Sequence, residues 1–119
     1  MLALIWFALF AQVGRTRSRL GIGLGDNGNP EMYTAVRRYG NFVECVPLAL
    51  LLLYIVEDNG AAAKWVHALG AILVVARAIH PFGINVDKMN APARIIGAGG
   101  TVFVIVACAV TLLYQFFVA

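Results

Sequence analysis

The sequence predicts an all-α integral membrane protein that crosses the bilayer as a bundle of four helices. Of its 119 residues, 61% are hydrophobic and only 13% are charged, whereas soluble domains carry about 25% charged residues. The apolar residues are gathered into long runs rather than amphipathic stripes, which favours lipid as the surrounding solvent. A chain of this length forms a single domain at most, here residues 1–119.

The first helix is expected at about residues 1–14. Its apolar run spans only about 20 Å, short of the hydrocarbon core of about 30 Å. Either the polar stretch that follows continues the helix, or the sequence starts inside a longer first helix. A signal peptide is the competing interpretation, but its basic residues would precede the apolar run. Here they follow it, at Arg15, Arg17 and Arg19, so we favour a transmembrane helix.

A glycine-rich loop is expected at residues 14–29. Its run G-I-G-L-G, residues 21–25, invites a nucleotide-binding interpretation. No strand precedes this run and the spacing is not G-x-G-x-x-G, so we interpret it as a flexible connection.

The second helix is expected at residues 30–57. Asn29 can cap it, Pro30 fits the first helical position, and Glu31 suits the positive end of the helix dipole. The run Asp58-Asn59-Gly60 ends it. At about 42 Å the helix is longer than the membrane is thick, so its first turns should stand out on the loop side.

The third and fourth helices are expected at residues 61–84 and 92–118. Pro81 interrupts the third near its end and should kink it. The fourth has no charge after Arg94. Its glycines at positions 97, 99 and 100 let helix backbones approach closely in lipid.

The basic residues indicate the topology of the chain in the membrane. All but Lys64 fall near the ends that bound the first and third loops: Arg15, Arg17, Arg19, Arg37, Arg38, Arg77, Lys88 and Arg94. By the positive-inside rule these two loops are cytoplasmic and both termini face the other side. This placement explains the net charge of +3 better than nucleic-acid binding does. Cys45 and Cys108 lie within apolar runs and indicate neither a metal site nor a disulfide.

Several polar residues fall within the predicted membrane helices, where such residues usually face the bundle interior. Arg37, Asn41 and Glu44 share one face of the second helix, and Arg77 and His80 share one face of the third. Arg94 begins the fourth helix on the same side. These residues predict a polar pocket for a small anionic ligand that also bears an amine, since Arg clamps carboxylates and Glu pairs with ammonium groups.

Structural roles are the alternative for some of these residues. Glu44 and Arg77 could form a buried ion pair that only sets the register of the helices. Arg38 and Tyr39 lie off the Arg37–Glu44 face and are interpreted as interfacial anchors.

The sequence resembles the superfamily of membrane-associated proteins in eicosanoid and glutathione metabolism, especially its small bacterial members. The resemblance is carried by residues 23–50, with the core R-x-x-x-N-x-x-E-x-x-P at Arg37, Asn41, Glu44 and Pro47. Two weaker segments add to it, A-R-A-I-H-P-F-G at residues 76–83 and A-P-A-R at residues 91–94.

The resemblance implies a homotrimer that binds glutathione between neighbouring subunits near the cytoplasmic side. The implied glutathione-binding residues are Arg37, Asn41, Glu44, Arg77 and His80. Arg94 would match the arginine that stabilises the glutathione thiolate, and one or more of Arg15, Arg17 and Arg19 are candidates to reach the site from a neighbouring subunit. Phe82 and Ile84 stand where several eukaryotic relatives carry tyrosines, so the resemblance implies no particular eicosanoid reaction.

The leading hypothesis is therefore a glutathione transferase of a bacterial inner membrane, in which glutathione attacks an apolar electrophile that arrives from the lipid. Reduction of lipid hydroperoxides is a variant on the same site, and no metal is expected. The first alternative is a non-catalytic protein of the same fold that binds lipid or a partner. A small multidrug transporter is a remote alternative, because such transporters carry their key glutamate in the first helix, which has no acid here.

Overall fold

The computed structural model describes residues 1–88 and 91–118, and the described residues form helices and no strand. The helices are α1 (Leu2–Leu20), α2 (Pro30–Asp58), α3 (Ala63–Ile79) and α4 (Pro92–Val118), with a short 3-10 helix, η1 (His80–Gly83), after α3. The predicted all-α fold class is confirmed.

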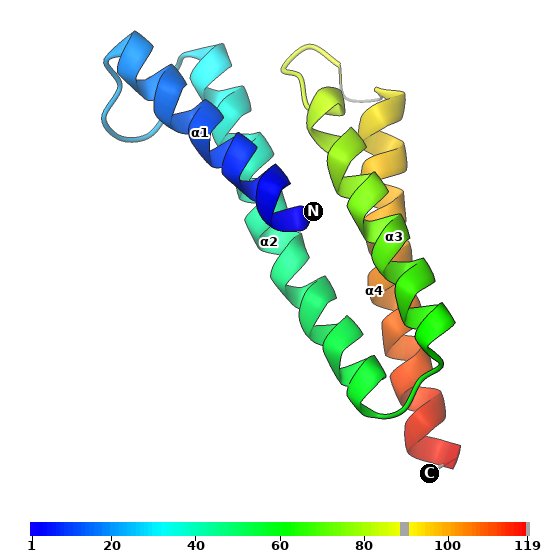
Figure 1. Ribbon diagram of the computed structural model, residues 1–119. Coiled ribbons are helices and arrows are strands. Elements are labelled where there is room, and N and C mark those ends of the chain that lie inside the picture. The colour runs from blue at the N-terminus through cyan, green and yellow to red at the C-terminus, as the bar shows by residue number, and fades with distance from the viewer. Residues whose placement is uncertain (89–90, 119) are drawn as a thin grey trace.

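The helices form an elongated bundle of 55 × 26 × 20 Å (Figure 1). Helices α3 and α4 lie side by side along their length, and α1 packs against the first half of α2. The α1–α2 and α3–α4 loops lie at one end of the bundle, which we call the Arg-rich end. The α2–α3 turn and the end of α4 lie at the other.

Helix α1 is longer than the sequence predicted, because the polar stretch continues it. The expected loop at residues 14–29 is wrong over residues 14–20, because α1 ends only at Leu20. Its C-cap is Gly21, whose φ of 67° is left-handed and whose N–H donates to the carbonyl of Arg17. Glycine adopts this conformation without steric cost, and Arg and Leu are good helix formers.

The predicted start of α2 is confirmed. Asn29 is its N-cap, and the Asn29 Oδ1 accepts hydrogen bonds from the N–H groups of Glu31 at 2.9 Å and Met32 at 3.0 Å. These bonds satisfy two of the donors that the first turn of a helix leaves free. The helix ends at Asp58, one residue beyond the predicted boundary.

The predicted break at Pro81 is also confirmed. Helix α3 begins at Ala63, two residues later than expected, and its α-helical part ends at Ile79. The chain continues as η1, with Pro81 in its first turn, because proline has no N–H to donate within an α-helix.

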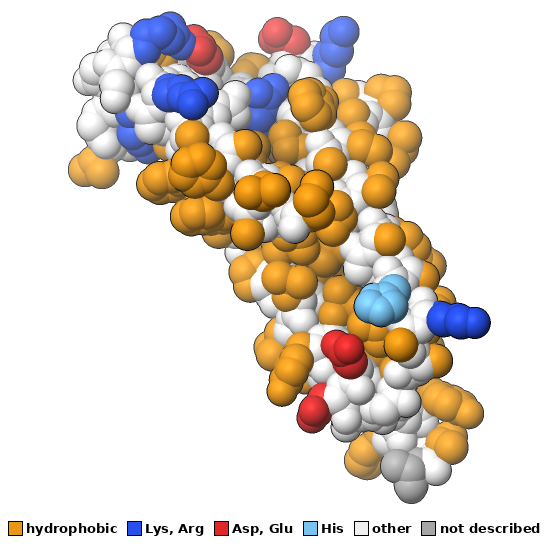
Figure 2. Space-filling model, viewed as in Figure 1, with side chains coloured by type: hydrophobic (Ala, Val, Ile, Leu, Met, Phe, Trp, Pro, Cys, Tyr) orange, Lys and Arg blue, Asp and Glu red, His pale blue; other side chains and the backbone are white. Residues whose placement is uncertain are grey.

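Within the described residues, three helical segments are long and apolar enough to cross a membrane: Pro30–Asp58, Ala63–Gly83 and Pro92–Val118. Helix α1 is not among them; its last turns carry three arginines. Charged side chains gather toward the two ends of the face seen in Figure 2, and hydrophobic side chains cover most of the span between them. The protein is therefore an integral membrane protein.

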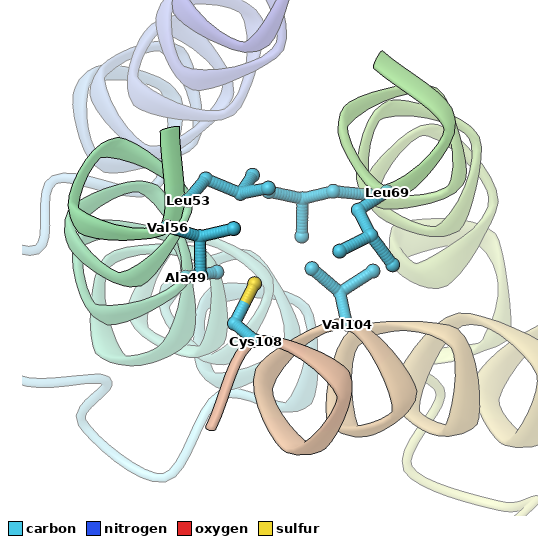
Figure 3. Close-up of a cluster of buried hydrophobic side chains, with 7 residues drawn as sticks. Ala49, Leu53, Val56, Leu69, Val104 and Cys108 are labelled. Carbon is cyan, nitrogen blue, oxygen red and sulfur yellow. The ribbon is translucent and has the colours of Figure 1, made fainter. Parts of the chain in front are cut away.

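The main hydrophobic core lies between α2, α3 and α4, away from the Arg-rich end (Figure 3). Its buried residues are Ala49, Leu53, Val56, Leu69, Leu73, Val104 and Cys108. A smaller core of Leu9, Phe42 and Val46 joins α1 to α2. The two cores hold the helices together below the polar residues at the Arg-rich end.

Glycines bring α4 into close contact with α3 and η1. A Cβ placed on Gly97 would lie 2.5 Å from the Cβ of His80, and one on Gly100 would lie 2.9 Å from the Cβ of Ala76. A Cβ on Gly83 would lie only 2.0 Å from the backbone N of Arg94. Small residues allow this approach, which matters in lipid because dispersion contacts there replace the hydrophobic effect.

We expect Gly97→Ala to destabilise the protein by about 1–3 kcal/mol, because the added methyl group overpacks the α3–α4 contact. Gly99→Ala is the matched control, since a Cβ there meets nothing within 4 Å and alanine favours the helix. Unfolding of both variants in detergent measures the difference. Equal stability of the two variants would contradict the assigned role of Gly97.

Candidate functional site

A cavity of about 480 Å³ opens at the Arg-rich end, between α2 on one side and η1, the α3–α4 loop and α4 on the other. Its lining brings together four of the six predicted site residues, Arg37, Asn41, His80 and Arg94. The remaining lining residues are Tyr33, Thr34, Ile84, Asn85, Val86 and Ala98. Glu44 and Arg77 do not line the cavity.

Helix α2 supplies one wall of the cavity from a single face. Tyr33 and Thr34 precede Arg37 by four and three residues, and Asn41 follows it by four, so these side chains lie on one side of the helix. The sequence analysis identified Arg37 and Asn41 and missed the two residues before them. The same helical spacing, extended by one turn toward the N-terminus, could have found Tyr33 and Thr34.

Glu44 does not line the cavity, but it forms an ion pair with Arg37, which does. The two nitrogens of the Arg37 guanidinium donate to Glu44 Oε1 at 3.3 Å and Oε2 at 3.4 Å. Both side chains are substantially exposed, Arg37 by 42% and Glu44 by 57%. Neither group is buried, so both remain within reach of a ligand.

Arg77 is buried, with only 2% of its surface exposed. Its Nη1 donates to Asn41 Oδ1 at 2.8 Å, and its Nη2 donates to the carbonyl of Gly97 at 2.8 Å. The alternative of a register-setting ion pair between Glu44 and Arg77 is wrong, because Glu44 pairs with Arg37 and the guanidinium of Arg77 instead bonds Asn41, one turn before Glu44.

His80 and Arg94 form the opposite wall. His80 is buried in η1, whereas Arg94 is exposed in the first turn of α4. The backbone of Arg94 lies directly against Gly83, so η1 fixes where α4 begins. Among the described residues, the Arg94 side chain makes no hydrogen bond and no ion pair.

Residues 84–86, which follow η1 in the α3–α4 loop, line this cavity. Arg38 Nη2 donates to the carbonyl of Ile84 at 3.1 Å and so ties the segment to α2. On the other side, Asn85 and Val86 line a second cavity of about 470 Å³ next to α1. Arg38 was predicted to be an interfacial anchor, and no sequence signal could have shown its bond to a residue 46 positions away.

The arginines of α1 have mostly local partners. Arg17 donates to the carbonyls of Ile22 and Gly25, which shapes the α1–α2 loop, and Arg19 pairs with Glu31. Arg15 is exposed. Neither Arg17 nor Arg19 lines the cavity.

The described residues contain no group of three or more His, Cys, Asp or Glu side chains that could hold a metal ion. Cys45 is half-buried and Cys108 lies in the main core, both as free thiols. The cavity is therefore lined by guanidinium, imidazole, amide, phenol and hydroxyl groups, and the carboxylate of Glu44 lies beside it on Arg37.

Comparison with known proteins places this arrangement in a family. The sequence matches the MAPEG family over residues 1–114. The chain belongs to the MAPEG family. The resemblance inferred from Arg37, Asn41 and Glu44 is thereby confirmed.

Two curated relatives are both called inner membrane protein YecN, from Escherichia coli strain K12 and from Escherichia coli O6:H1. Each is 35% identical to this chain over 83 residues, which cover 70% of this chain and 63% of the relative. The match thus spans less than two thirds of each relative's length. No solved structure matches the chain.

We expect Arg38→Met to loosen the segment that borders the cavity, because its hydrogen bond to the carbonyl of Ile84 is lost. Amide hydrogen exchange at residues 84–88 should become faster, while exchange in the main core stays slow. Arg15→Met is the matched control, since Arg15 is an exposed arginine on α1. Unchanged exchange in the Arg38 variant would show that this bond does not hold the segment.

Proposed function

We propose that this protein is a membrane-bound glutathione transferase. The observation that carries the proposal is the convergence of Arg37, Asn41, His80 and Arg94, from α2, η1 and α4, on one cavity at the Arg-rich end. Family membership supports it, because MAPEG proteins include glutathione transferases and peroxidases.

The chemistry of the cavity fits glutathione, a tripeptide with two carboxylates, one ammonium group and one thiol. A volume of about 480 Å³ falls within the range of about 300–1,000 Å³ common for small-molecule sites. The Arg37 guanidinium can bind a carboxylate through two parallel hydrogen bonds. Glu44, which already pairs with Arg37, can accept the ammonium group at the same end of the ligand.

Arg94 is assigned the catalytic role. Its guanidinium lines the cavity without a partner among the described residues, and a nearby positive charge lowers the pKa of a bound thiol. The thiolate sulfur then forms a bond to the electrophilic carbon of an apolar substrate, and the leaving group departs with the electron pair of its bond. His80, on the same wall, is a further hydrogen-bonding group for the peptide.

Reduction of a lipid hydroperoxide uses the same thiolate. The sulfur attacks the peroxide oxygen and releases an alcohol, and a second glutathione completes the reaction to glutathione disulfide and water. The apolar surface around α3 and α4 lets either kind of substrate reach the Arg-rich end through lipid.

The exposed ion pair of Arg37 and Glu44 supports assembly as a homotrimer. Charged side chains are costly next to lipid, and a neighbouring subunit that covers this face removes that cost. From the positive-inside rule we propose that the Arg-rich end lies in the cytoplasm and the end of α4 on the other side of the membrane. We propose the bacterial inner membrane as the location, which is also the location in the name of the E. coli relatives.

We expect saturable glutathione binding to the detergent-solubilised protein by calorimetry. Arg37→Met should weaken it by about 10- to 100-fold, because one charge-assisted hydrogen-bonding partner of the ligand is lost. Lys64→Met is the control, since Lys64 is an exposed cation at the other end of the bundle, and it should bind as the wild type does. No binding by a folded wild-type protein would contradict the proposal.

We expect Arg94→Ala to retain binding but lose the ultraviolet absorbance of the bound thiolate, because the charge that stabilises the anion is gone. Turnover with a model electrophile should fall with the absorbance. A wild-type protein that binds glutathione but shows no thiolate absorbance would instead favour a non-catalytic binding protein of the same fold.

A further inference from the structure

Arg77 is a buried cation without a carboxylate partner. Among the described residues the ion pairs are Arg19–Glu31 and Arg37–Glu44, and the Arg77 Nε atom has no hydrogen-bond partner. A buried charge that lacks a counter-charge is costly, above all in a membrane helix, where ionisable residues mark functional sites. Helix packing alone would be served better by an apolar side chain.

The guanidinium of Arg77 joins three helices. It projects from α3, donates to the side chain of Asn41 on α2, and donates to the backbone of Gly97 on α4, both at 2.8 Å. Asn41 lines the cavity, and Gly97 lies three residues after Arg94 in the same helix. Arg77 therefore bonds a residue in each wall of the cavity, although its own side chain does not line the cavity.

The bond to Arg77 decides which way the amide of Asn41 faces. A guanidinium has five donors and no acceptor, so only the oxygen of the Asn41 amide can bond it. The Asn41 Nδ2, with its two N–H donors, then lies on the side of the amide away from this bond. Asn41 lines the cavity, and the atom of its amide that has no partner among the described residues is Nδ2, a donor that an acceptor on a ligand would match.

We propose that Arg77 is a positioning and specificity-determining residue, which acts through Asn41 and not by touching the ligand. It holds the Asn41 amide as a donor, so that this position selects a carboxylate of glutathione. Through the carbonyl of Gly97 it also holds the start of α4, and with it Arg94, at a fixed distance from α2. The assignment rests on the proposed function and replaces the direct glutathione contact that the sequence analysis predicted for Arg77.

Amide analogues of glutathione test which group faces Asn41. Each analogue replaces one carboxylate by a carboxamide, which offers a weaker acceptor without the negative charge. The analogue that lacks the carboxylate bound by Arg37 is identified because its weaker binding disappears in Arg37→Met, and the wild type should bind the other analogue about 10- to 100-fold more weakly than glutathione. In Arg77→Gln the glutamine amide can either donate or accept, so Asn41 is free to turn and this ratio should fall toward one.

A double-mutant cycle tests whether Arg77 acts through Asn41. Residues that act as one unit give non-additive losses. We therefore expect Asn41→Ala and Arg77→Gln each to weaken glutathione binding, and the double variant to bind no more weakly than the weaker-binding single variant. Arg77→Lys keeps the charge but lacks the two-armed geometry, so it should recover only part of the binding.

Asn41→Asp is a second variant that does not depend on the fold tolerating the loss of Arg77. The aspartate gives Arg77 a counter-charge, so the protein should fold, but it presents a carboxylate to the cavity and should repel the ligand. Binding at the wild-type level in this variant would overturn the assignment.

The same titrations separate this assignment from the proposed function. No saturable glutathione binding by the wild type overturns both. Wild-type binding together with additive losses in the cycle, or with an unchanged acid-to-amide ratio in Arg77→Gln, overturns only the role of Arg77. Both the proposed function and the role of Arg77 are supported if the wild type binds glutathione, the losses in the cycle are non-additive, and the acid-to-amide ratio falls toward one in Arg77→Gln.

Discussion

The rest of the site depends on two hydrogen bonds that the Arg77 guanidinium donates, one to Asn41 and one to the carbonyl of Gly97. Helices α2 and α4 supply the walls of the cavity, and Arg77 is buried between them. Its bonds to Asn41 and to the carbonyl of Gly97 set the spacing of those walls at the level where a ligand would bind. A buried guanidinium that lost these two bonds would leave further donors without a partner, which is costly.

Close packing makes this arrangement possible. Gly97 and Gly100 let α4 approach α3 until side chains on one helix meet backbone on the other, and Gly83 lets η1 press against the first turn of α4. The main core holds the opposite half of the bundle, and the polar groups are gathered at the Arg-rich end. The fold thus separates a region that stabilises the bundle from a region that presents charge.

The sequence predicted the helices well because their boundaries are marked by local chemistry. The cap at Asn29 and the break at Pro81 were both found from residue type, while the end of α1 was misplaced because glycine at position 14 is tolerated within a helix. Helical spacing found the α2 face of the site. It could not show that Glu44 pairs with Arg37 or that Arg38 reaches Ile84, since these contacts depend on rotamers and on a loop.

The measurement that tests the account most directly is a structure of the protein saturated with glutathione. The account predicts the tripeptide at the Arg-rich end, with a carboxylate on the Asn41 Nδ2 and its sulfur beside the Arg94 guanidinium. Arg77 should make the same two bonds as it does here and no bond to the ligand. Glutathione bound elsewhere, or bound here with its carboxylate on Arg77 itself, would contradict the account.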